Sequence, residues 1–284
     1  MSIVVTGATG HLGRLVVEQL LEKVPAERIT AVVRTPERAA GLAERGVRIA
    51  VADYNDPASF DGLFAAGDKV LLVSGNEFDQ GRVRQHTVVI EAARAAGVSL
   101  LAYTSAPGSL TAALADDHRG TEKVLADSGV PYTLLRNGWY HENYTENLAP
   151  VLAHDAVVAA AGDGRVSSAS RADYAAAAVA VLTGEGHENT AYELGGDTAW
   201  SFAEYAAELS RQTGKDIAYN AVSPEALVAL LTGAGVPEPF AQILAGVDAS
   251  IERGELVVPG GDLSRLIGRP TTPLSEAVAT ALAG

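Results

Sequence analysis

The chain contains no cysteine among its 284 residues. Disulfide bonds, thiolate metal sites, iron–sulfur clusters and a cysteine nucleophile are therefore excluded. Methionine occurs once, at Met1, and aromatic residues make up only 6% of the chain. The six histidines show none of the spacings that are typical of metal ligands, so we expect no bound metal.

Positive charge and long apolar runs are also scarce. The 21 basic residues face 35 acidic ones, which gives a net charge of −14 and disfavours a nucleic-acid partner. No apolar run approaches the ~18 residues of a membrane span. Residues 2–5 lead directly into a glycine turn, unlike a signal peptide. We therefore expect no membrane partner and a cytoplasmic location; the pattern predicts no particular oligomeric state.

The first half of the sequence alternates short apolar runs with helical patterns. Near-continuous Val, Ile and Leu content in the runs is typical of parallel strands covered on both faces. The pattern predicts strands at 3–6, 29–33, 47–52, 69–74, 100–104 and 132–136, and helices at 12–21, 36–44, 57–64, 83–96 and 121–127. Right-handed crossovers then give an α/β fold, a doubly wound Rossmann sheet with a ligand crevice at the carboxyl ends of its strands.

The pattern changes after residue 137. We expect residues 1–137 to form the Rossmann domain and residues 171–195 to return to it. Residues 138–170 and 196–284 then form a smaller, mostly helical lobe on the substrate side. Within that lobe Ser201 and Glu204 have the spacing of a helix capping box, and a serine followed by Pro224 predicts another helix start.

Three glycines between the first strand and the first helix have the spacing of a dinucleotide-binding turn. Gly7 permits the tight turn, Gly10 lets the backbone approach a diphosphate, and Gly13 lets the helix pack close to the strand. The helix N-terminus supplies free N–H groups and partial positive charge. We expect the cofactor to bind over Gly7, Ala8, Thr9, Gly10, His11 and Leu12.

The end of the second strand predicts which dinucleotide is bound. Enzymes that use NAD usually carry an acidic residue there, which holds the ribose 2′-hydroxyl. Here the strand ends in Arg34 and Thr35, and Arg38 follows one turn later. A guanidinium can clamp a 2′-phosphate, so the sequence predicts NADP(H) as the cofactor. The alternative is that Arg34 is a surface charge and NADH is used equally.

Residues after the later strands should complete the cofactor site. Asp53 and Tyr54 follow the third strand near the expected adenine, although Asp53 could equally be a turn or cap residue. The remaining positions are Ser74, Gly75, Asn76, Thr104 and Ser105.

Several segments resemble the NmrA-like atypical short-chain dehydrogenase/reductases. They are the glycine turn, Val32-Val33-Arg34, residues 102–105, Leu134 to Tyr140, residues 170–174 and residues 266–272. The resemblance covers essentially the whole chain and is closest to the bacterial NAD(P)H:quinone oxidoreductases of that family, with triphenylmethane reductase nearby. It implies that the loop after the sixth strand wraps the nicotinamide end of the cofactor and the substrate. The implied cofactor contacts are Asn137, Gly138, Trp139 and Tyr140, and the implied substrate contacts are Tyr140, Asn143 and Arg171.

The Tyr-x-x-x-Lys pair of ordinary short-chain dehydrogenases is missing. Alignment of the helix puts Leu114 at the tyrosine position and His118 at the lysine position. His118 could donate a proton or position an acceptor oxygen, with a pKa suited to neutral pH, or it could be a helix-start residue beside two aspartates. Tyr140 is a second catalytic candidate. Arg171 could reach the pocket or pair with Asp173.

A strongly electrophilic acceptor needs little help from a proton relay. We therefore predict an NADPH-dependent oxidoreductase that transfers hydride to a small-molecule quinone or a similar planar acceptor, mainly by positioning the two rings. A non-catalytic NADP(H)-sensing regulator is the alternative, because such a protein would also lack the pair. A cationic dye is another acceptor that the acidic composition allows.

Overall fold

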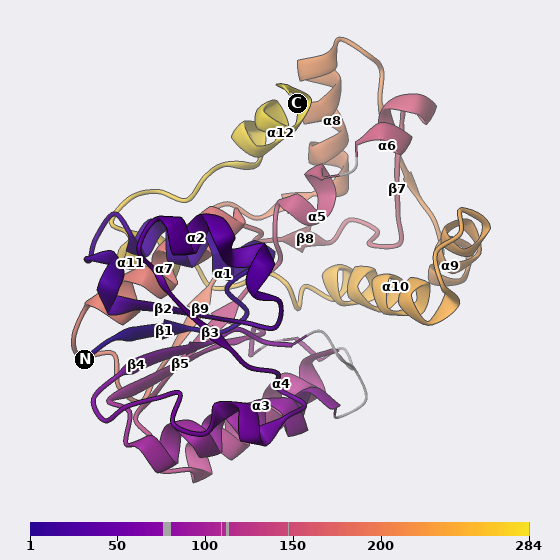
Figure 1. The fold of residues 1–284 in the computed structure, drawn as a ribbon. Helices are drawn as coiled ribbons and strands as arrows, with labels where there is room; N and C mark the ends of the chain where they lie inside the picture. The colour runs from indigo at the N-terminus through magenta and orange to yellow at the C-terminus, as the bar shows by residue number, and fades with distance from the viewer. Residues whose placement is uncertain (76–80, 109, 112–113, 147, 284) are drawn as a thin grey trace.

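A seven-stranded parallel sheet forms the centre of the protein (Figure 1). The computed structural model describes residues 1–75, 81–108, 110–111, 114–146 and 148–283. The strand order is β3-β2-β1-β4-β5-β6-β9, so the order reverses between β1 and β4. The strands are β1 (Ile3–Val5), β2 (Ile29–Val33), β3 (Arg48–Val51), β4 (Lys69–Leu72), β5 (Leu100–Ser105), β6 (Tyr132–Asn137) and β9 (Thr190–Leu194).

Helices cover both faces of this sheet, as expected for a doubly wound fold (Figure 1). One face carries α1 (His11–Leu20), α2 (Ala40–Glu44), α7 (Arg171–Thr183) and α11 (Asp262–Ile267), and the other carries α3 (Gly81–Ala96) and α4 (Leu114–Asp127). Side chains of a strand alternate between the two faces. Ile3 and Val5 therefore join the core under α1 and α7, while Val4 joins the core under α3 and α4.

The predicted Rossmann fold is confirmed, with differences in the short helices. The segment expected as a helix over 36–44 begins as a 3₁₀ helix, η2 (Pro36–Ala39). The helix expected over 57–64 is only the 3₁₀ turn η3 (Pro57–Phe60); a third such turn is η1 (Ala26–Arg28). Helix α4 begins at Leu114 instead of residue 121, because its first turns are mostly polar in sequence and show no apolar period.

The smaller lobe is mostly helical but also contains short strands. Its helices are α5 (Glu142–Thr145), α6 (Ala149–His154), α8 (Phe202–Thr213), α9 (Pro224–Gly233), α10 (Glu238–Glu252) and α12 (Leu274–Ala283). Ser201 and Glu204 form the expected capping box, and Ser223 caps α9. The strand pairs are β7 (Ala156–Ala159) with β11 (Ala218–Ala221), and β8 (Arg165–Val166) with β10 (Trp200–Ser201). Of these strands the sequence pattern predicts only one, over residues 217–222, and it corresponds to β11.

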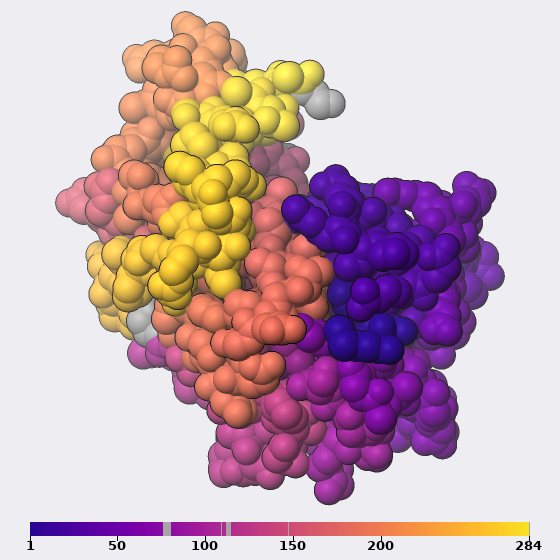
Figure 2. Space-filling view, turned by 90° about the vertical axis from the view of Figure 1, so that its left-hand side faces the viewer, coloured from indigo at the N-terminus to yellow at the C-terminus, as the bar shows by residue number. Residues whose placement is uncertain are grey.

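The C-terminal segment joins the two halves of the molecule. Helix α11 (Asp262–Ile267) lies within residues 196–284, which we expected to belong to the smaller lobe. It packs instead on α7 and β9, because Leu263, Leu266 and Ile267 enter the core under α1 and α7. Beyond it, Arg269 pairs with the fully buried Asp173 on α7, and α12 reaches α8. In Figure 2 this segment, in yellow, runs along the surface between the two halves. In the part of the chain that the structure describes, no helix has the length and apolar content that a membrane crossing needs.

Candidate active site

A groove of about 310 Å³ opens at the carboxyl ends of β1 to β4. The β1–α1 turn forms one wall, and Gly7 there has a φ of +60°, which residues with a side chain rarely adopt. A Cβ atom on Gly13 would lie 2.3 Å from the Gly7 carbonyl oxygen, so only glycine lets α1 approach the turn this closely. The glycine spacing therefore has the structural cause that we inferred from the sequence.

Two cations stand at the end of the groove that β2 forms. Arg34 and Arg38 both line it and are both exposed. Asp53 lines it as well, and its carboxylate accepts a hydrogen bond from the Asn55 N–H at 2.9 Å, as expected for a turn residue. Tyr54 closes the floor by donating to the Val73 carbonyl at 2.9 Å.

A second, larger cleft of about 620 Å³ continues from the first and shares Ser74 with it. Strand ends β4, β5 and β6 form its base, and the loop over residues 137–144 forms a side. Across from them, α10 contributes Phe240, Ile243, Leu244 and Val247 to the lining. Their i, i+3, i+4, i+7 spacing makes one apolar helix face.

Most of the residues that we singled out from the sequence line one of these two spaces. Gly7, Thr9, Gly10, Arg34, Ser74 and Gly75 line the groove, and Ser74, Thr104, Ser105, His118, Asn137, Gly138, Trp139, Tyr140, Asn143 and Arg171 line the cleft. Ala8 and Leu12 are buried behind the turn, and His11 is exposed at the start of α1, so none of these three lines the groove. Asn76 lies outside the described residues.

The strand-end hydroxyls already have partners. Thr104 accepts a hydrogen bond from the Ser74 N–H at 2.8 Å, which ties the end of β5 to the end of β4. Ser105 donates to Glu122 at 2.6 Å, and the same carboxylate pairs with Arg136. These contacts fix the base of the cleft and leave hydroxyl lone pairs to accept further hydrogen bonds.

Tyr140 has the environment of a neutral hydrogen-bond donor. Burial raises its pKa, although a hydrogen bond from the Asn137 side chain and the charge of Arg171 act against this. The Arg171 guanidinium lies over the Tyr140 ring, 5.3 Å from its centre, and Tyr174 packs edge-on against the ring. The phenol therefore stays protonated at neutral pH and has a fixed ring plane.

Arg171 reaches the cleft, as one of our two alternatives held. Its ionic partner is Glu146, and its backbone N–H donates to Glu142 at 2.9 Å. Asp173, the other alternative, accepts from Arg269 at 2.6 Å and from the Thr272 N–H at 2.8 Å. An Arg171–Asp173 ion pair is therefore wrong, because the C-terminal segment occupies the aspartate.

His118 is buried in a polar network instead of standing at an exposed helix start. Its Nδ1 lies 2.8 Å from the Tyr103 hydroxyl and its Nε2 lies 3.2 Å from Nη1 of Arg82. Burial, with the charge of Arg82, lowers the pKa of His118 to about 3. We expected a value near neutrality from the sequence; burial beside a guanidinium overturns that, because both effects oppose a second positive charge.

Sequence reasoning missed several residues of the cleft. Arg82 gives no sequence signal, because it precedes the apolar period by which we recognised its helix. The apolar face of α10 is visible in the sequence as a helical period, but nothing local shows that it meets the strand ends. Asp248 extends that face by one residue and was also missed.

Several polar side-chain atoms near α5 and α10 are buried with few or no hydrogen-bond partners in the described part of the chain. The Asp248 carboxylate accepts from the Ala160 N–H at 2.7 Å, and burial raises its pKa from 3.8 to about 6. The Tyr144 hydroxyl is buried with no hydrogen-bond partner among the described residues, and so is Oδ1 of Asn137. Buried polar atoms usually have partners, so these two indicate that the cleft receives a polar ligand.

These features fit a dinucleotide. The turn leaves room for backbone contact with a diphosphate, two guanidiniums stand where a ribose phosphate would lie, and the unpartnered Asn137 oxygen points to a ligand at the far end. Among the described residues, no cluster of three or more metal-ligating side chains occurs. The fold and the site thus define a Rossmann protein that binds a dinucleotide beside a second cleft.

Comparison with known proteins agrees with this class. Residues 7–185 match the model of a family described as NAD(P)H-binding. Quinone oxidoreductase 2 of Escherichia coli is 48% identical over 97% of both chains. The NAD(P)H azoreductase of Xenophilus azovorans is 31% identical over 96% of both. The chain therefore belongs to the NAD(P)H-binding family and, within it, to the NmrA-like reductases that the sequence motifs resemble.

Solved structures extend the likeness to three dimensions. An NADPH-dependent quinone oxidoreductase from Escherichia coli, complexed with NADPH, matches with a TM-score of 0.95 at 47% identity over 99% of each chain. A triphenylmethane reductase from a Citrobacter species, complexed with NADP(H), matches with a TM-score of 0.94 at 43% identity, covering 99% of this chain and 100% of that one.

Proposed function

We propose that this protein is an NADPH-dependent oxidoreductase that reduces quinones and related electrophilic planar acceptors in the larger cleft. The observation that carries the proposal is the cleft itself, which continues from the groove at Ser74 and ends against an apolar face of α10. A protein that only sensed the cofactor would have no need of a second space of this size. The named activities of the reductases reported above support the same conclusion.

NADPH, when bound, supplies a hydride from nicotinamide C4. In the proposal the β1–α1 turn binds the diphosphate through its backbone N–H groups, and Arg34 and Arg38 bind the 2′-phosphate. Ser74, Thr104 and Asn137 hold the nicotinamide half, because they lie at the strand ends where the groove meets the cleft. Ala8, His11 and Leu12 act through the backbone conformation of the turn.

The acceptor then lies between the strand ends and α10. The side chains of Trp139, Tyr140 and Tyr144 give the cleft flat walls that suit a planar ring, and α10 excludes water from one side. The Tyr140 phenol, which burial keeps protonated, can donate a hydrogen bond to an acceptor oxygen. Asn143 and Arg171 bound the same part of the cleft as further substrate contacts.

A panel of small benzoquinones and naphthoquinones tests the proposal. Purified protein should oxidise NADPH, followed by its absorbance, when a quinone is added, and slowly or not at all without one. Binding of NADP⁺ without turnover of any quinone or dye would refute the reductase and favour the sensor. The cytoplasmic location and the domain boundaries that we drew from the sequence stay predictions.

A further inference from the structure

Arg82, in the first turn of α3, lines the cleft although only 4% of the residue is exposed. A charge so deeply buried is costly unless the surrounding structure holds it. Burial lowers the pKa of Arg82, but arginine keeps its charge at any physiological pH. Arg82 belongs to none of the sequence motifs described above, and none of the cofactor or acceptor contacts proposed above involves it.

A buried histidine contacts the Arg82 guanidinium. Nη1 of Arg82 lies 3.2 Å from Nε2 of His118, and a guanidinium can only donate hydrogen bonds. Nε2 must therefore be the bare nitrogen, and the single ring proton must sit on Nδ1, which donates to the Tyr103 hydroxyl at 2.8 Å. His118 is thus neutral, so it orients the guanidinium without adding charge to the pair.

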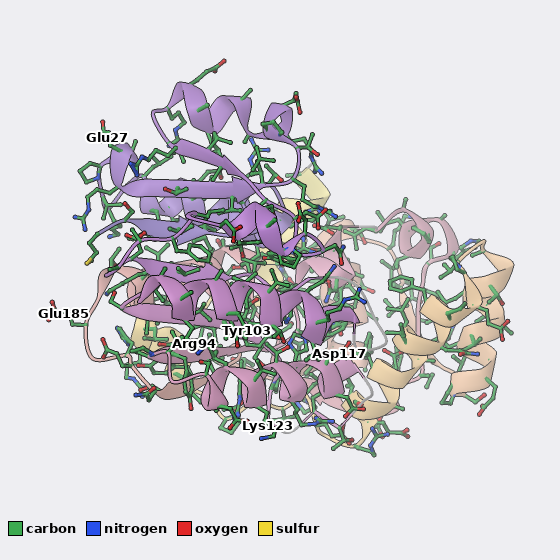
Figure 3. All side chains as sticks on the ribbon, turned by 60° about the horizontal axis from the view of Figure 1, so that its bottom comes forward. Glu27, Arg94, Tyr103, Asp117, Lys123 and Glu185 are labelled. Carbon is green, nitrogen blue, oxygen red and sulfur yellow. The ribbon has the colours of Figure 1, made fainter. Side chains whose placement is uncertain are left out.

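The hydrogen bonds continue to the cofactor groove. Tyr103 bonds Thr121, whose hydroxyl donates to the Asp117 carbonyl at 2.9 Å and accepts from Nδ1 of His86 at 2.9 Å. Nε2 of His86 in turn accepts from the Gly75 N–H at 2.9 Å. In Figure 3, Tyr103 lies at the level of α3 and α4, and Asp117 lies closer to the smaller lobe. This network gives each ring nitrogen of His86 and His118 a defined donor or acceptor role.

We propose that Arg82 binds the carbonyl oxygen of the acceptor and stabilises the negative charge that develops there during hydride transfer. The proposal rests on the proposed function, which supplies the acceptor and the hydride. It also explains how the protein works without the Tyr-x-x-x-Lys pair. A fixed cation replaces a proton donor, and the network sets its position before the substrate arrives.

The electrons and atoms balance without a protein acid. The quinone receives the hydride, two electrons and one hydrogen nucleus, from nicotinamide C4, so the bond to that carbon breaks and a bond to the quinone forms. One negative charge then resides on a quinone oxygen. Arg82 keeps its protons and donates hydrogen bonds to that oxygen, and water supplies the proton that completes the hydroquinone.

Two acceptors separate this role from a structural one. A benzoquinone develops negative charge on oxygen, whereas a cationic triphenylmethane dye accepts hydride at carbon and only loses its positive charge. Arg82→Met should lower kcat with the quinone by about 10²-fold, the order expected for loss of a preorganised donor. Turnover of the dye should change less than about threefold. Arg84→Met, on the exposed side of the same helix turn, is the matched control and should change neither activity.

Parallel losses with both acceptors, or a matching loss of NADPH affinity, would overturn the proposal and make Arg82 a structural or cofactor-binding residue. Arg82→Lys covers the case in which the Met variant does not fold, because it keeps the charge and loses only the planar fork. Its kcat should then fall selectively with the quinone. If wild-type protein does not reduce the dye, a rescue experiment replaces this comparison. Added guanidinium should raise the quinone turnover of Arg82→Ala at least tenfold. Absence of this increase overturns the proposal. Failure of wild-type protein with every quinone refutes the proposed function instead.

Discussion

Asp248 offers a direct measurement of what it costs to bury a charge in the cleft. Asp248 lines the cleft from α10, and its carboxylate accepts a hydrogen bond from the Ala160 N–H at 2.7 Å. Burial raises its pKa from 3.8 to about 6. The folded protein therefore binds the proton more tightly than the unfolded chain, so ionisation of Asp248 destabilises the fold. The substitution Asp248→Asn removes this cost and keeps an oxygen that can accept from Ala160.

The size and the pH range follow from the same pKa. The rise in the pKa of Asp248 from 3.8 to about 6 corresponds to about 3 kcal/mol at pH values where the carboxylate is ionised in both states. The cost is absent below the unfolded pKa of 3.8, grows as the pH rises, and is complete above about 6. The variant should therefore be more stable than wild type by about 3 kcal/mol at pH 8 but by only about 1 kcal/mol at pH 4.5.

Thermal unfolding of both proteins at pH 8 and at pH 4.5 checks this expectation. A gain of this size corresponds to a rise in Tm of about 5–10 °C for a chain of this length at pH 8. Asp61→Asn is the control, because that carboxylate is exposed and the chemical change is the same. An equal Tm difference at the two pH values would refute the reasoning, since only a titrating carboxylate gives a difference that depends on pH.

Three further substitutions address the cofactor site and the buried network. Arg34→Ala should raise the KM for NADPH about tenfold and leave the KM for NADH nearly unchanged. The substitution removes one exposed, solvent-screened cation from the position of the 2′-phosphate. Equal changes in KM for both cofactors would show that Arg34 does not bind the 2′-phosphate. Gly13→Ala puts a Cβ atom 2.3 Å from the Gly7 carbonyl oxygen, so helix α1 must shift. The affinity for NADPH, measured by titration calorimetry, should then fall at least about tenfold. Unchanged affinity would contradict the requirement for a close approach between α1 and the turn. His118→Gln keeps a hydrogen-bond acceptor for Arg82. The pH profile of kcat should stay unchanged between pH 6 and 8, because the pKa of His118, about 3 in the folded protein, already keeps the imidazole neutral there. Loss of a titration near pH 6.5 in the variant would show that His118 acts as an acid.

The Rossmann half was predictable because its signals are local. Each strand is a short apolar run, each crossover carries its own helix, and the glycine spacing marks the turn that α1 must approach. The smaller lobe was harder to predict, since β7 pairs with β11 from about 60 residues away and neither strand carries a complete apolar alternation. Helix α11 lies next to lobe segments in the sequence, but its apolar side chains complete the core of the other half.

The residues of the candidate site also fall into those that the sequence predicts and those that only the structure reveals. Residues at strand ends were found because parallel strands bring their carboxyl ends to one edge. Arg171 stayed ambiguous until the C-terminal segment was seen to occupy Asp173. The pKa of His118 was missed because burial and the charge of Arg82 lower it, and neither is visible along the chain.

The sequence by itself determined the fold class, the dinucleotide site and the preference for a phosphorylated ribose, because these depend on residue types at fixed spacings. Only the tertiary structure decided what the second cleft contains. Arg82 and His118 meet because α3 and α4 pack side by side on the sheet. Asp248 lines the same cleft because α10 lies across from the strand ends. The charge, burial and hydrogen-bond partners of these side chains depend on this packing. They determine which side chain can bind an acceptor and which only positions another side chain.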